Sequence, residues 1–486
     1  MLKKARVGVR LRRFREERGL TQAALAEALG ISPSYVTQME ANQRPMTAPV
    51  LLKLASVYDV DIGDFSTDEA DRLVALLQDA VADPSIGEHV AQAEIRELAE
   101  AMPAVARYLV EVHRRYRHTL EVNQTIAKRV DAGTIGSASM GSPMAYEEVR
   151  DLFYAERNYF PALDELAERT FEAAGLAVGQ TATGIAARLA ASHGTRIVDL
   201  ADDAPTDVQR RYDPDAGVLA LSPLLDPGQR AFQLATHLAF MEAAGPIEEV
   251  VERAGLSSDE TRALARIGLA NYFAGALMMP YRRFLDAAEA LRYDIDLLCR
   301  RFGVGYETVA HRLSSLQRPG ARGVPFFFVR VDRAGNISKR QSATDFHFSR
   351  VGGSCPLWNI YEAFTSPGQI RTQLAQMPDG RKYLWIARTV TRSNGGYGAP
   401  AKTFAIGLGC DLQHAGRLVY ADGLDLDNPS AFVPIGPGCK VCARESCPQR
   451  AFPAIGKPLE VDRHRSRFTP YRVGARPGTT PAPAGR

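Results

Sequence analysis

Hydrophobic residues between positions 7 and 62 recur at helical spacing in four short segments, which glycine and small polar residues separate. Helices are therefore predicted over residues 9–17, 22–29, 33–41 and 48–58. Gly30 suits the left-handed turn that ends one helix, and Ser32 followed by Pro33 is a typical start of the next. A helix, a glycine turn and a second helix of this length form the motif that places its second helix in the major groove of DNA.

The third of these helices, residues 33–41, carries short polar side chains on the face that its hydrophobic residues leave free. Such side chains suit hydrogen bonds to base edges and phosphates. The DNA-binding candidates on this helix and around it are Gln22, Ser32, Ser34, Tyr35, Thr37, Gln38, Asn42 and Arg44. A four-helix protein-interaction module is the competing interpretation. Residues 1–18 hold eight Lys and Arg against two Glu, and this basic block beside the polar helix favours DNA.

Residues 66–145 continue at helical spacing and end with a Gly/Ser-rich stretch at 136–143, which has the composition of a linker. Within residues 104–130 one apolar stripe is formed by Val105, Leu109, Val112, Tyr116 and Leu120. The stripe fits two interpretations equally well: packing within one chain, or the seam of a homodimer or higher homo-oligomer. Because one helix-turn-helix reads only a short half-site, we expect DNA binding to be dimeric.

Residues 146–322 alternate helical spacing with brief strand-like runs at 196–200 and 218–221, which predicts an α/β domain. From residue 323 to residue 471, segments rich in β-branched and aromatic residues dominate, and turn residues separate them. Strands are predicted over residues 326–331, 346–349, 383–390, 403–408 and 418–420. The last residues, 472–486, have the Pro/Gly/Ala/Arg-rich composition of a disordered tail.

The predicted fold is therefore multidomain. An all-α helix-turn-helix domain over residues 1–65 and a helical linker over 66–145 precede an α+β region, whose C-terminal part is a mostly antiparallel sheet. The length of 486 residues and the 45% of hydrophobic residues agree with several globular domains. No apolar run approaches the roughly 20 residues that span a bilayer, and no apolar segment of a secretory signal follows the basic N-terminus. We expect a cytoplasmic protein without a membrane partner.

The segment from Gln233 to Met241 resembles the helix of zinc metallopeptidases but lacks their metal ligands. That chemistry needs His-Glu-x-x-His, in which two histidines one turn apart bind zinc and the glutamate is the base. His237 matches the first histidine, whereas Leu238 replaces the glutamate and Met241 replaces the second histidine. Because one histidine cannot hold a catalytic zinc, residues 146–322 are interpreted as a degenerate peptidase-like domain with no catalytic residues and with His237 in its core.

Three cysteines near the C-terminus, Cys439, Cys442 and Cys447, lie within nine residues on a loop framed by glycine and proline. In a reducing compartment this spacing favours a metal or cluster site over disulfides. The candidates for a fourth ligand are Cys355 in Gly-Gly-Ser-Cys-Pro and Cys410 in Gly-Leu-Gly-Cys. A compact trio with one distant Cys-Pro favours a [4Fe–4S] cluster over zinc, which usually takes two Cys-x2-Cys pairs. Unliganded thiols are the third interpretation.

Arginines are frequent beside the apolar helices of the middle region. They occur at Tyr281-Arg-Arg283, Arg292-Tyr293, His311-Arg312 and 318–322. An apolar pocket with a cationic mouth suits an acyl-CoA, because the phosphates stay outside while the acyl chain lies inside. The alternative interpretation is that these arginines belong to solvated helix faces.

Up to Pro453 the chain resembles one family, the short-chain fatty acyl-CoA regulators of the RamB and PrpR type. The resemblance rests on the order of the domains and on the runs 269–281, 331–339, 352–358 and 439–450. It implies a DNA-binding regulator of propionate and acetate metabolism whose C-terminal half, including a β-rich sensor domain over 323–471, senses a short acyl-CoA. It also implies an iron–sulfur cluster in at least part of the family.

The cluster ligands that the resemblance implies here are Cys355, Cys439, Cys442 and Cys447, with Cys410 as the alternative fourth ligand. Our candidates for the effector pocket as a whole are Arg169, Tyr272, Tyr281, Arg312, Lys339 and Arg340. Two other functions stay open beside the acyl-CoA regulator. One is a redox-responsive regulator that signals through the cluster, and the other is a repressor-cleaving peptidase. Since His-Glu-x-x-His is missing, we expect no enzyme.

Overall fold

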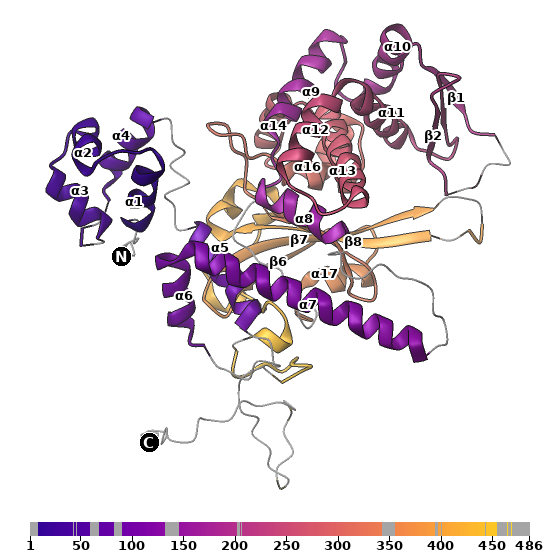
Figure 1. Ribbon diagram of the computed structural model, residues 1–486. Coiled ribbons are helices and arrows are strands. Elements are labelled where there is room, and N and C mark those ends of the chain that lie inside the picture. The colour runs from indigo at the N-terminus through magenta and orange to yellow at the C-terminus, as the bar shows by residue number, and fades with distance from the viewer. Residues whose placement is uncertain are drawn as a thin grey trace. The chain divides into compact units, whose positions relative to one another are not determined.

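The computed structural model (Figure 1) describes most of the chain. The described residues are 8–41, 43–44, 46–58, 68–81, 90–131, 145–201, 205, 207–342, 355–393, 397–399, 401–442, 444–453, 464 and 468. The chain divides into two compact units, of which the first ends at Arg117 and the second begins at His118. No helix among the described residues is long and apolar enough to cross a membrane.

The first unit begins with four short helices. These are α1 Gly8–Glu17, α2 Gln22–Leu29, α3 Pro33–Glu40 and α4 Ala48–Tyr58. Gly30 ends α2 with a φ of 65°, and the Ser32 hydroxyl accepts a hydrogen bond from the Tyr35 N–H at 3.2 Å where α3 begins. Their small core contains Leu11, Phe14, Leu25, Ala26, Leu29, Val36, Met39, Val50 and Leu54. The predicted helix-turn-helix is therefore confirmed.

Three more helices follow: α5 Asp68–Val81, α6 Gln92–Ala101 and α7 Pro103–Asp131. The break between α6 and α7 falls at Met102, as expected for a residue before proline, which disfavours the helical conformation. α7 continues past the boundary between the two units. The buried residues that α5, α6 and α7 share are Leu73, Val74, Leu77, Ile95, Ala99 and Ala106. The expected linker at 136–143 lies outside the described residues.

The second unit begins with a helical layer and a small sheet. Its helices are α8 Ala145–Ala155, α9 Pro161–Ala173, α10 Thr181–His193, α11 Pro227–Glu242, α12 Ala244–Arg253, α13 Asp259–Met278, α14 Tyr281–Ala290, α15 Ile295–Phe302 and α16 Tyr306–Leu313. The strands β1 Arg196–Asp199, β2 Arg210–Asp213 and β3 Val218–Leu221 pair in the order β1-β3-β2. β3 is parallel to β1 and antiparallel to β2. The sequence predicted β1 and β3, but β2 was missed because Arg-Arg-Tyr-Asp has no hydrophobic alternation.

A five-stranded sheet follows, in the order β5-β4-β8-β7-β6, and every neighbouring pair of strands is antiparallel. The strands are β4 Phe327–Val331, β5 Ile337–Ser342, β6 Arg371–Gln376, β7 Lys382–Ser393 and β8 Ala401–Asp411. The short helices are α17 Asn359–Glu362, η2 Ala363–Thr365, η3 Leu412–Arg417, η4 Val419–Ala421, η5 Pro429–Ala431 and η6 Cys439–Val441. This sheet confirms the mostly antiparallel C-terminal part and, with the helices before it, the predicted multidomain fold.

Two strand predictions have different outcomes. The prediction of a strand at 418–420 is wrong, because a short 3-10 helix begins at Val419. The Val419 N–H donates to the Arg292 carbonyl oxygen at 2.9 Å and not to a neighbouring strand. The strand expected at 346–349 lies outside the described residues. The edge strands β5 and β6 were missed, since both are rich in polar residues.

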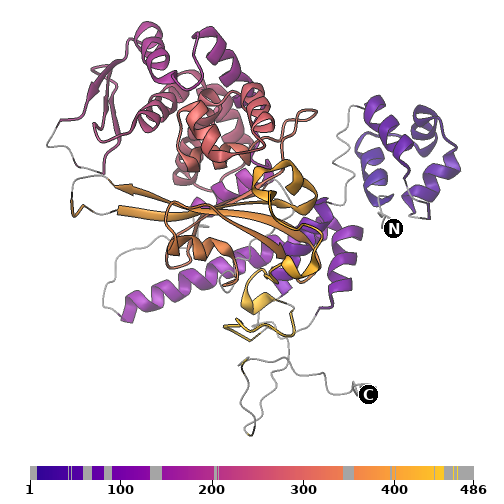
Figure 2. The same ribbon diagram turned by 180° about the vertical axis from the view of Figure 1, so that it is seen from behind.

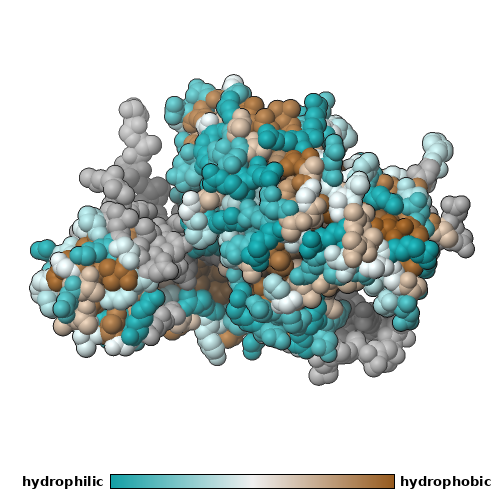
Figure 3. Space-filling view, turned by 90° about the horizontal axis from the view of Figure 1, so that it is seen from above, coloured by the Kyte–Doolittle hydropathy of each residue, from teal (hydrophilic) through white to brown (hydrophobic). Residues whose placement is uncertain are grey.

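The two faces of the five-stranded sheet have different partners. The helical layer covers one face, and α17 lies on the other (Figures 1 and 2). Leu384 and Ile406 belong to the same hydrophobic core as the helices. On the opposite face, the rings of Trp358 and Trp385 lie 5.2 Å apart, centroid to centroid. Over the surface seen in Figure 3, hydrophobic residues gather in several small areas among hydrophilic ones.

Candidate functional site

A chain of hydrogen bonds links the predicted DNA-reading helix α3 to helices α1 and α2. Glu40, buried at the end of α3, accepts hydrogen bonds from Arg15 Nε at 2.6 Å and from Gln22 Nε2 at 2.7 Å. The Gln22 amide oxygen in turn accepts one from the Thr37 hydroxyl at 2.9 Å. The hydrogen bond to Glu40 raises the pKa of Arg15, so the guanidinium keeps its positive charge. The network joins α1, α2 and α3 and fixes the candidates Gln22 and Thr37.

The other DNA-binding candidates lie on α3 and next to it. Ser32, Ser34 and Thr37 are exposed, and Tyr35 and Gln38 are partly exposed. The Arg44 guanidinium lies 5.5 Å from the centre of the Tyr35 ring. Asn42 lies outside the described residues. The exposed side of α3 therefore carries hydroxyl and amide groups, which can donate to and accept from base edges.

Replacing Gln38 or Thr37 with alanine is expected to weaken binding to a specific operator by ~1–3 kcal/mol for each lost base contact. Fluorescence anisotropy with operator DNA and with a scrambled sequence measures the loss. The matched control is Ser56→Ala on α4, which removes an exposed hydroxyl that donates to the Lys53 carbonyl oxygen at 2.9 Å. Unchanged operator affinity in both α3 variants would contradict the assignment of the recognition helix.

His237 lies on α11, in the sequence position of a first zinc ligand, and it is buried. Its ring lies 4.3 Å from the Tyr212 ring, centroid to centroid. Burial lowers the pKa of His237 to about 4, and the charges of Arg210 and His193 add to this effect. A neutral imidazole packed on an aromatic ring is the environment expected of a core histidine. In the described part of the chain, no three His, Cys, Asp or Glu side chains lie close enough to hold one metal ion.

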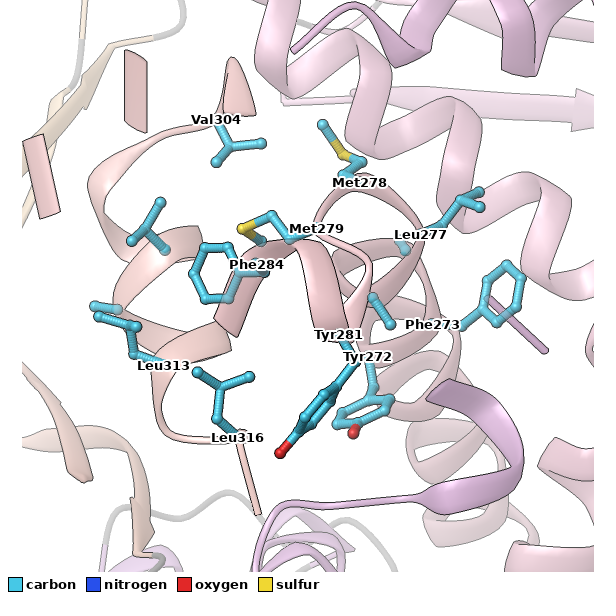
Figure 4. Packing of buried hydrophobic residues seen from close by; sticks show 14 of the residues in the cluster. Tyr272, Phe273, Leu277, Met278, Met279, Tyr281, Phe284, Val304, Leu313 and Leu316 are labelled. Atoms are coloured by element: carbon cyan, nitrogen blue, oxygen red, sulfur yellow. The ribbon is translucent and has the colours of Figure 1, made fainter. Parts of the chain in front are cut away.

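Three of the six effector-pocket candidates meet in the buried centre of the helical layer. Arg312 on α16 places Nη2 2.5 Å and Nη1 3.3 Å from the two carboxylate oxygens of Asp164 on α9. The Tyr272 hydroxyl on α13 donates to the same carboxylate at 2.5 Å. Tyr281 lies beside Tyr272, with both hydroxyl groups turned to the same side (Figure 4), and the centre of its ring is 5.5 Å from the Arg312 guanidinium carbon.

This geometry places Arg312 in the interior of the helical layer, not at a cationic pocket mouth. Only 2% of the surface of Arg312 is exposed to solvent. Besides Asp164, the guanidinium donates to the Met279 carbonyl oxygen and to the Ser315 hydroxyl, each at 3.1 Å. A buried guanidinium whose donors are engaged in this way is not available to a phosphate. Arg312 instead holds α9, α13 and α16 together around one carboxylate.

The other three candidates lie elsewhere in the second unit. Arg169 is exposed on α9. Lys339 lies on the edge strand β5 with Nζ 5.9 Å from the centre of the Phe328 ring, and burial lowers the pKa of Lys339 to about 8. Arg340, the next residue of β5, lies 3.7 Å from a carboxylate oxygen of Glu147 on α8. Contacts within the described chain therefore do not join all six candidates into one pocket.

Four of the six cysteines line one pocket beside the five-stranded sheet. The pocket is partly open to solvent. Its lining consists of Cys355, Pro356, Pro434, Gly436, Gly438, Cys439, Cys442, Arg444, Cys447 and Arg450. The structure thus brings Cys355 to the C-terminal trio, although these segments are far apart in the sequence.

The edge strand β6 holds both cysteine segments. Gln373 of β6 donates from its side-chain amide to the Leu357 carbonyl oxygen, two residues after Cys355, at 2.8 Å. At the end of β6, the Gln376 N–H donates to the Val433 carbonyl oxygen at 2.9 Å. The Gln376 carbonyl oxygen accepts a hydrogen bond from Arg444 at 2.5 Å. One strand therefore fixes the positions of the two segments that form the pocket.

The thiols of the pocket have close polar and steric neighbours. Burial raises the pKa of the Cys355 thiol, and hydrogen bonds with the backbone of Leu357 and Gly436 lower it in part. A Cβ at Gly436 would lie 2.7 Å from the Cys442 sulfur, so this loop needs glycine there. The Ala451 N–H donates to the Cys439 sulfur at 3.4 Å. Hydrogen bonds of this kind tune iron–sulfur clusters held by thiolates.

Cys410 lies in a different environment. It is fully buried on β8, opposite Leu384 of β7, and belongs to the hydrophobic core between the sheet and the helices. Burial raises the pKa of its thiol far above the usual range. Cys410 does not line the cysteine pocket, so the structure favours Cys355 as the fourth member.

Two arginines of the pocket were missed by the sequence reasoning. Arg444 and Arg450 both line it, and Arg450 is buried. The available signal was the position of Arg450, three residues after Cys447 in Cys-Pro-Gln-Arg. A charged residue so close to a thiol cluster is a candidate partner for its charge, whereas the search for ligands considered only the cysteines.

Three family models match the chain in the order of these features. A helix-turn-helix model matches residues 11–65, and an IrrE N-terminal-like domain model of the M78 peptidases matches residues 190–314. A model described as short-chain fatty acyl coenzyme A regulator, C-terminal, matches residues 315–471. With the α1–α4 domain and its polar recognition helix, these matches define a DNA-binding transcriptional regulator.

Several known proteins are similar over nearly their whole length. The HTH-type transcriptional regulators PrpR and RamB of Mycobacterium tuberculosis are 53% identical over 464 residues and 50% identical over 477 residues. The matches cover 96% and 97% of this chain, and 95% and 99% of those proteins. The propionyl-CoA carboxylase regulator of Cereibacter sphaeroides is 43% identical over 473 residues, 97% of this chain and 100% of that protein.

A solved structure of a Mycobacterium tuberculosis transcriptional regulator is 55% identical, with a TM-score of 0.66. It covers 68% of this chain and 100% of its own. The chain therefore belongs to the short-chain fatty acyl coenzyme A regulators, the family of PrpR and RamB, which confirms the resemblance found in the sequence.

Proposed function

We propose that the protein regulates genes of short-chain fatty acid metabolism in the cytoplasm, and that a short acyl-CoA changes its affinity for an operator in double-stranded DNA. The observation that carries this proposal is the match of residues 315–471 to the C-terminal model of the acyl coenzyme A regulators. A relative that is similar end to end and is named a propionyl-CoA carboxylase regulator supports it. The exposed polar face of α3 supplies the DNA-reading surface.

Cationic residues of the second unit support an acyl-CoA as the effector. Lys339 and Arg340 are neighbours on the edge strand β5, and Arg169 is exposed on α9. Phosphates of CoA need several such partners. The Tyr272 and Arg312 network around Asp164 would then hold the helices behind the pocket rather than contact the ligand. Selectivity among acetyl, propionyl and butyryl chains should be modest, since one methylene contributes ~1–3 kcal/mol in an apolar pocket.

We also propose that the cysteine pocket holds a [4Fe–4S] cluster, with zinc as the alternative. The residue types fit this group, because Cys355, Cys439, Cys442 and Cys447 line one pocket. Each iron of such a cluster takes a single cysteine, so no three thiols need to lie close to one ion. Gly436 has no side chain, so the backbone of the loop can approach the Cys442 sulfur closely. This close approach agrees with a loop that folds around a bound group. When bound, such a cluster supplies a redox-active centre and stabilises the fold around it.

A homodimer is part of the proposal. On α7, Val105, Leu109, Val112 and Tyr116 are between 41% and 47% exposed, while the side chain of Leu120 lies outside the described residues. These residues share one stripe at helical spacing, which suits a partner helix. Two copies would place two recognition helices on two half-sites. The operator titration should then show two chains for each DNA molecule.

Isothermal titration with propionyl-CoA, acetyl-CoA and free CoA tests the effector. We expect an acyl-CoA to bind and to change operator affinity by a factor of roughly 5–150, the usual range for linked sites. Lys339→Gln should weaken acyl-CoA binding about tenfold, because it removes a charge-assisted phosphate contact. The matched control is Arg333→Gln, which removes an exposed charge from the turn before β5. No binding below about millimolar concentration would overturn the acyl-CoA proposal.

A redox-responsive regulator is the second candidate, and the shared cysteine pocket is the observation that favours it. In that case operator affinity would follow the oxidation state of the protein and would ignore acyl-CoA. Titrating DNA binding under anaerobic conditions, first with acyl-CoA and then with an oxidant, separates the two functions. Peptidase activity is not proposed, because His237 is buried and Leu238 and Met241 replace its catalytic partners.

A further inference from the structure

Arg450 contacts the backbone of all three cysteines of the C-terminal loop. Its Nη1 donates to the Cys439 carbonyl oxygen at 3.1 Å, and its Nη2 donates to that of Cys442 at 3.5 Å. Its backbone N–H donates to the Cys447 carbonyl oxygen at 3.2 Å. Nη2 also donates to the Arg444 carbonyl oxygen. One residue therefore ties together the turns that present three of the four thiols to the pocket.

The guanidinium of Arg450 is a positive charge with almost no access to water. The residue is 3% exposed and lines the cysteine pocket. Its hydrogen-bond partners within the described chain are carbonyl oxygens, none is a carboxylate, and Nε has no partner there. A buried cation is strongly unfavourable unless an opposite charge lies nearby. The thiol groups that line the same pocket can supply that charge, once they are ionised by binding to metal.

We infer that Arg450 is a positioning residue for the [4Fe–4S] cluster, which orders the ligand loop through its carbonyl groups and compensates the charge of the ligated cluster. The inference rests on the cluster proposed above. Four thiolates around a [4Fe–4S]²⁺ core give a net charge of about −2, and one added electron makes it about −3. A fixed positive charge beside the pocket stabilises the reduced form more, so it raises the reduction potential.

Two substitutions in the full-length protein separate the charge of Arg450 from its hydrogen bonds. Arg450→Gln removes the charge, so we expect the equilibrium constant for one-electron reduction to fall about tenfold, which equals about 59 mV. Arg450→Lys keeps the charge and should stay within about threefold of the unchanged protein. Both variants lose the forked contacts to the carbonyl groups, so a chelator should remove iron from both about tenfold faster. A reductive titration with dithionite, followed by electron paramagnetic resonance, gives the potentials. Visible absorbance follows the loss of iron.

Lys440→Gln is the matched control. It removes the same charge one residue away from Cys439, but the Lys440 side chain is partly exposed, and its Nζ lies 5.3 Å from the centre of the Phe452 ring. Because solvent and salt screen exposed charges, the equilibrium constant for reduction and the rate of iron loss should each change by less than about twofold.

The outcomes distinguish this inference from the cluster proposal. If the unchanged protein binds about four iron atoms and Arg450→Gln has the same potential and the same rate of iron loss, only the role of Arg450 is overturned. If Arg450→Gln does not fold or load, Arg450→Lys decides, and iron loss at the original rate would overturn the ordering role. Zinc, or no metal, in the unchanged protein would overturn the cluster and this inference together.

Discussion

Cys355→Ala is expected to abolish the brown colour of anaerobically purified protein, together with about four iron atoms per chain, whereas Cys410→Ala should keep both. Cys355 lines the same pocket as the C-terminal trio, while Cys410 is packed in the core between the sheet and the helices. Iron analysis and visible spectra of the two variants, compared with the unchanged protein, give the result. A brown Cys355→Ala protein beside a colourless Cys410→Ala protein would reverse the assignment.

Cys439→Ala, Cys442→Ala and Cys447→Ala should each give the same loss of iron. The variants should also unfold at lower urea concentration, because the free energy of ligation is part of the free energy of folding. Cys299→Ala is the control, since Cys299 lies on α15 and does not line the pocket. Stoichiometric zinc in colourless unchanged protein would decide for a zinc site.

Asp164→Ala is expected to destabilise the second unit by about 3–5 kcal/mol. The substitution leaves the Arg312 guanidinium, whose side chain is 3% exposed, without its carboxylate partner, and it also removes the acceptor of the Tyr272 hydroxyl. The control is Asp286→Ala, which breaks an exposed ion pair with Arg282 and should cost less than about 1 kcal/mol. Urea unfolding followed by tryptophan fluorescence measures both. Equal stability of the two variants would show that the buried pair does not hold the helices together.

The helix-turn-helix could be predicted because its signals are local. Gly30, Ser32 and Pro33 mark the turn and the start of α3 in the sequence itself, and the hydrophobic spacing marks the core. The Arg15 and Glu40 pair gave no such signal, since residues on different helices meet only in the folded domain.

Long-range pairing explains what the sequence did not reveal in the second unit. The edge strands β5 and β6 consist largely of polar residues, and only their partners β4 and β7 make them strands. In the same way, Cys355 and Cys410 both lie in glycine-containing segments, so the local sequence left the fourth cysteine open. Only the folded chain distinguishes the two cysteines, because Gln373 of the edge strand β6 holds the Cys355 segment by a hydrogen bond to the Leu357 carbonyl oxygen.

The position of the cysteine segments beside β6 also affects the tendency of the protein to aggregate. An open sheet ends in strands whose outer backbone groups are a template for pairing with a second molecule. At β6 some of these backbone groups are already paired within the chain. The Val433 N–H donates to the Leu374 carbonyl oxygen at 2.8 Å, and the Val433 carbonyl oxygen accepts from the Gln376 N–H. If the loop that carries the thiols detached, these groups would be exposed. If the pocket holds the proposed cluster, its loss would therefore favour aggregation through strand pairing.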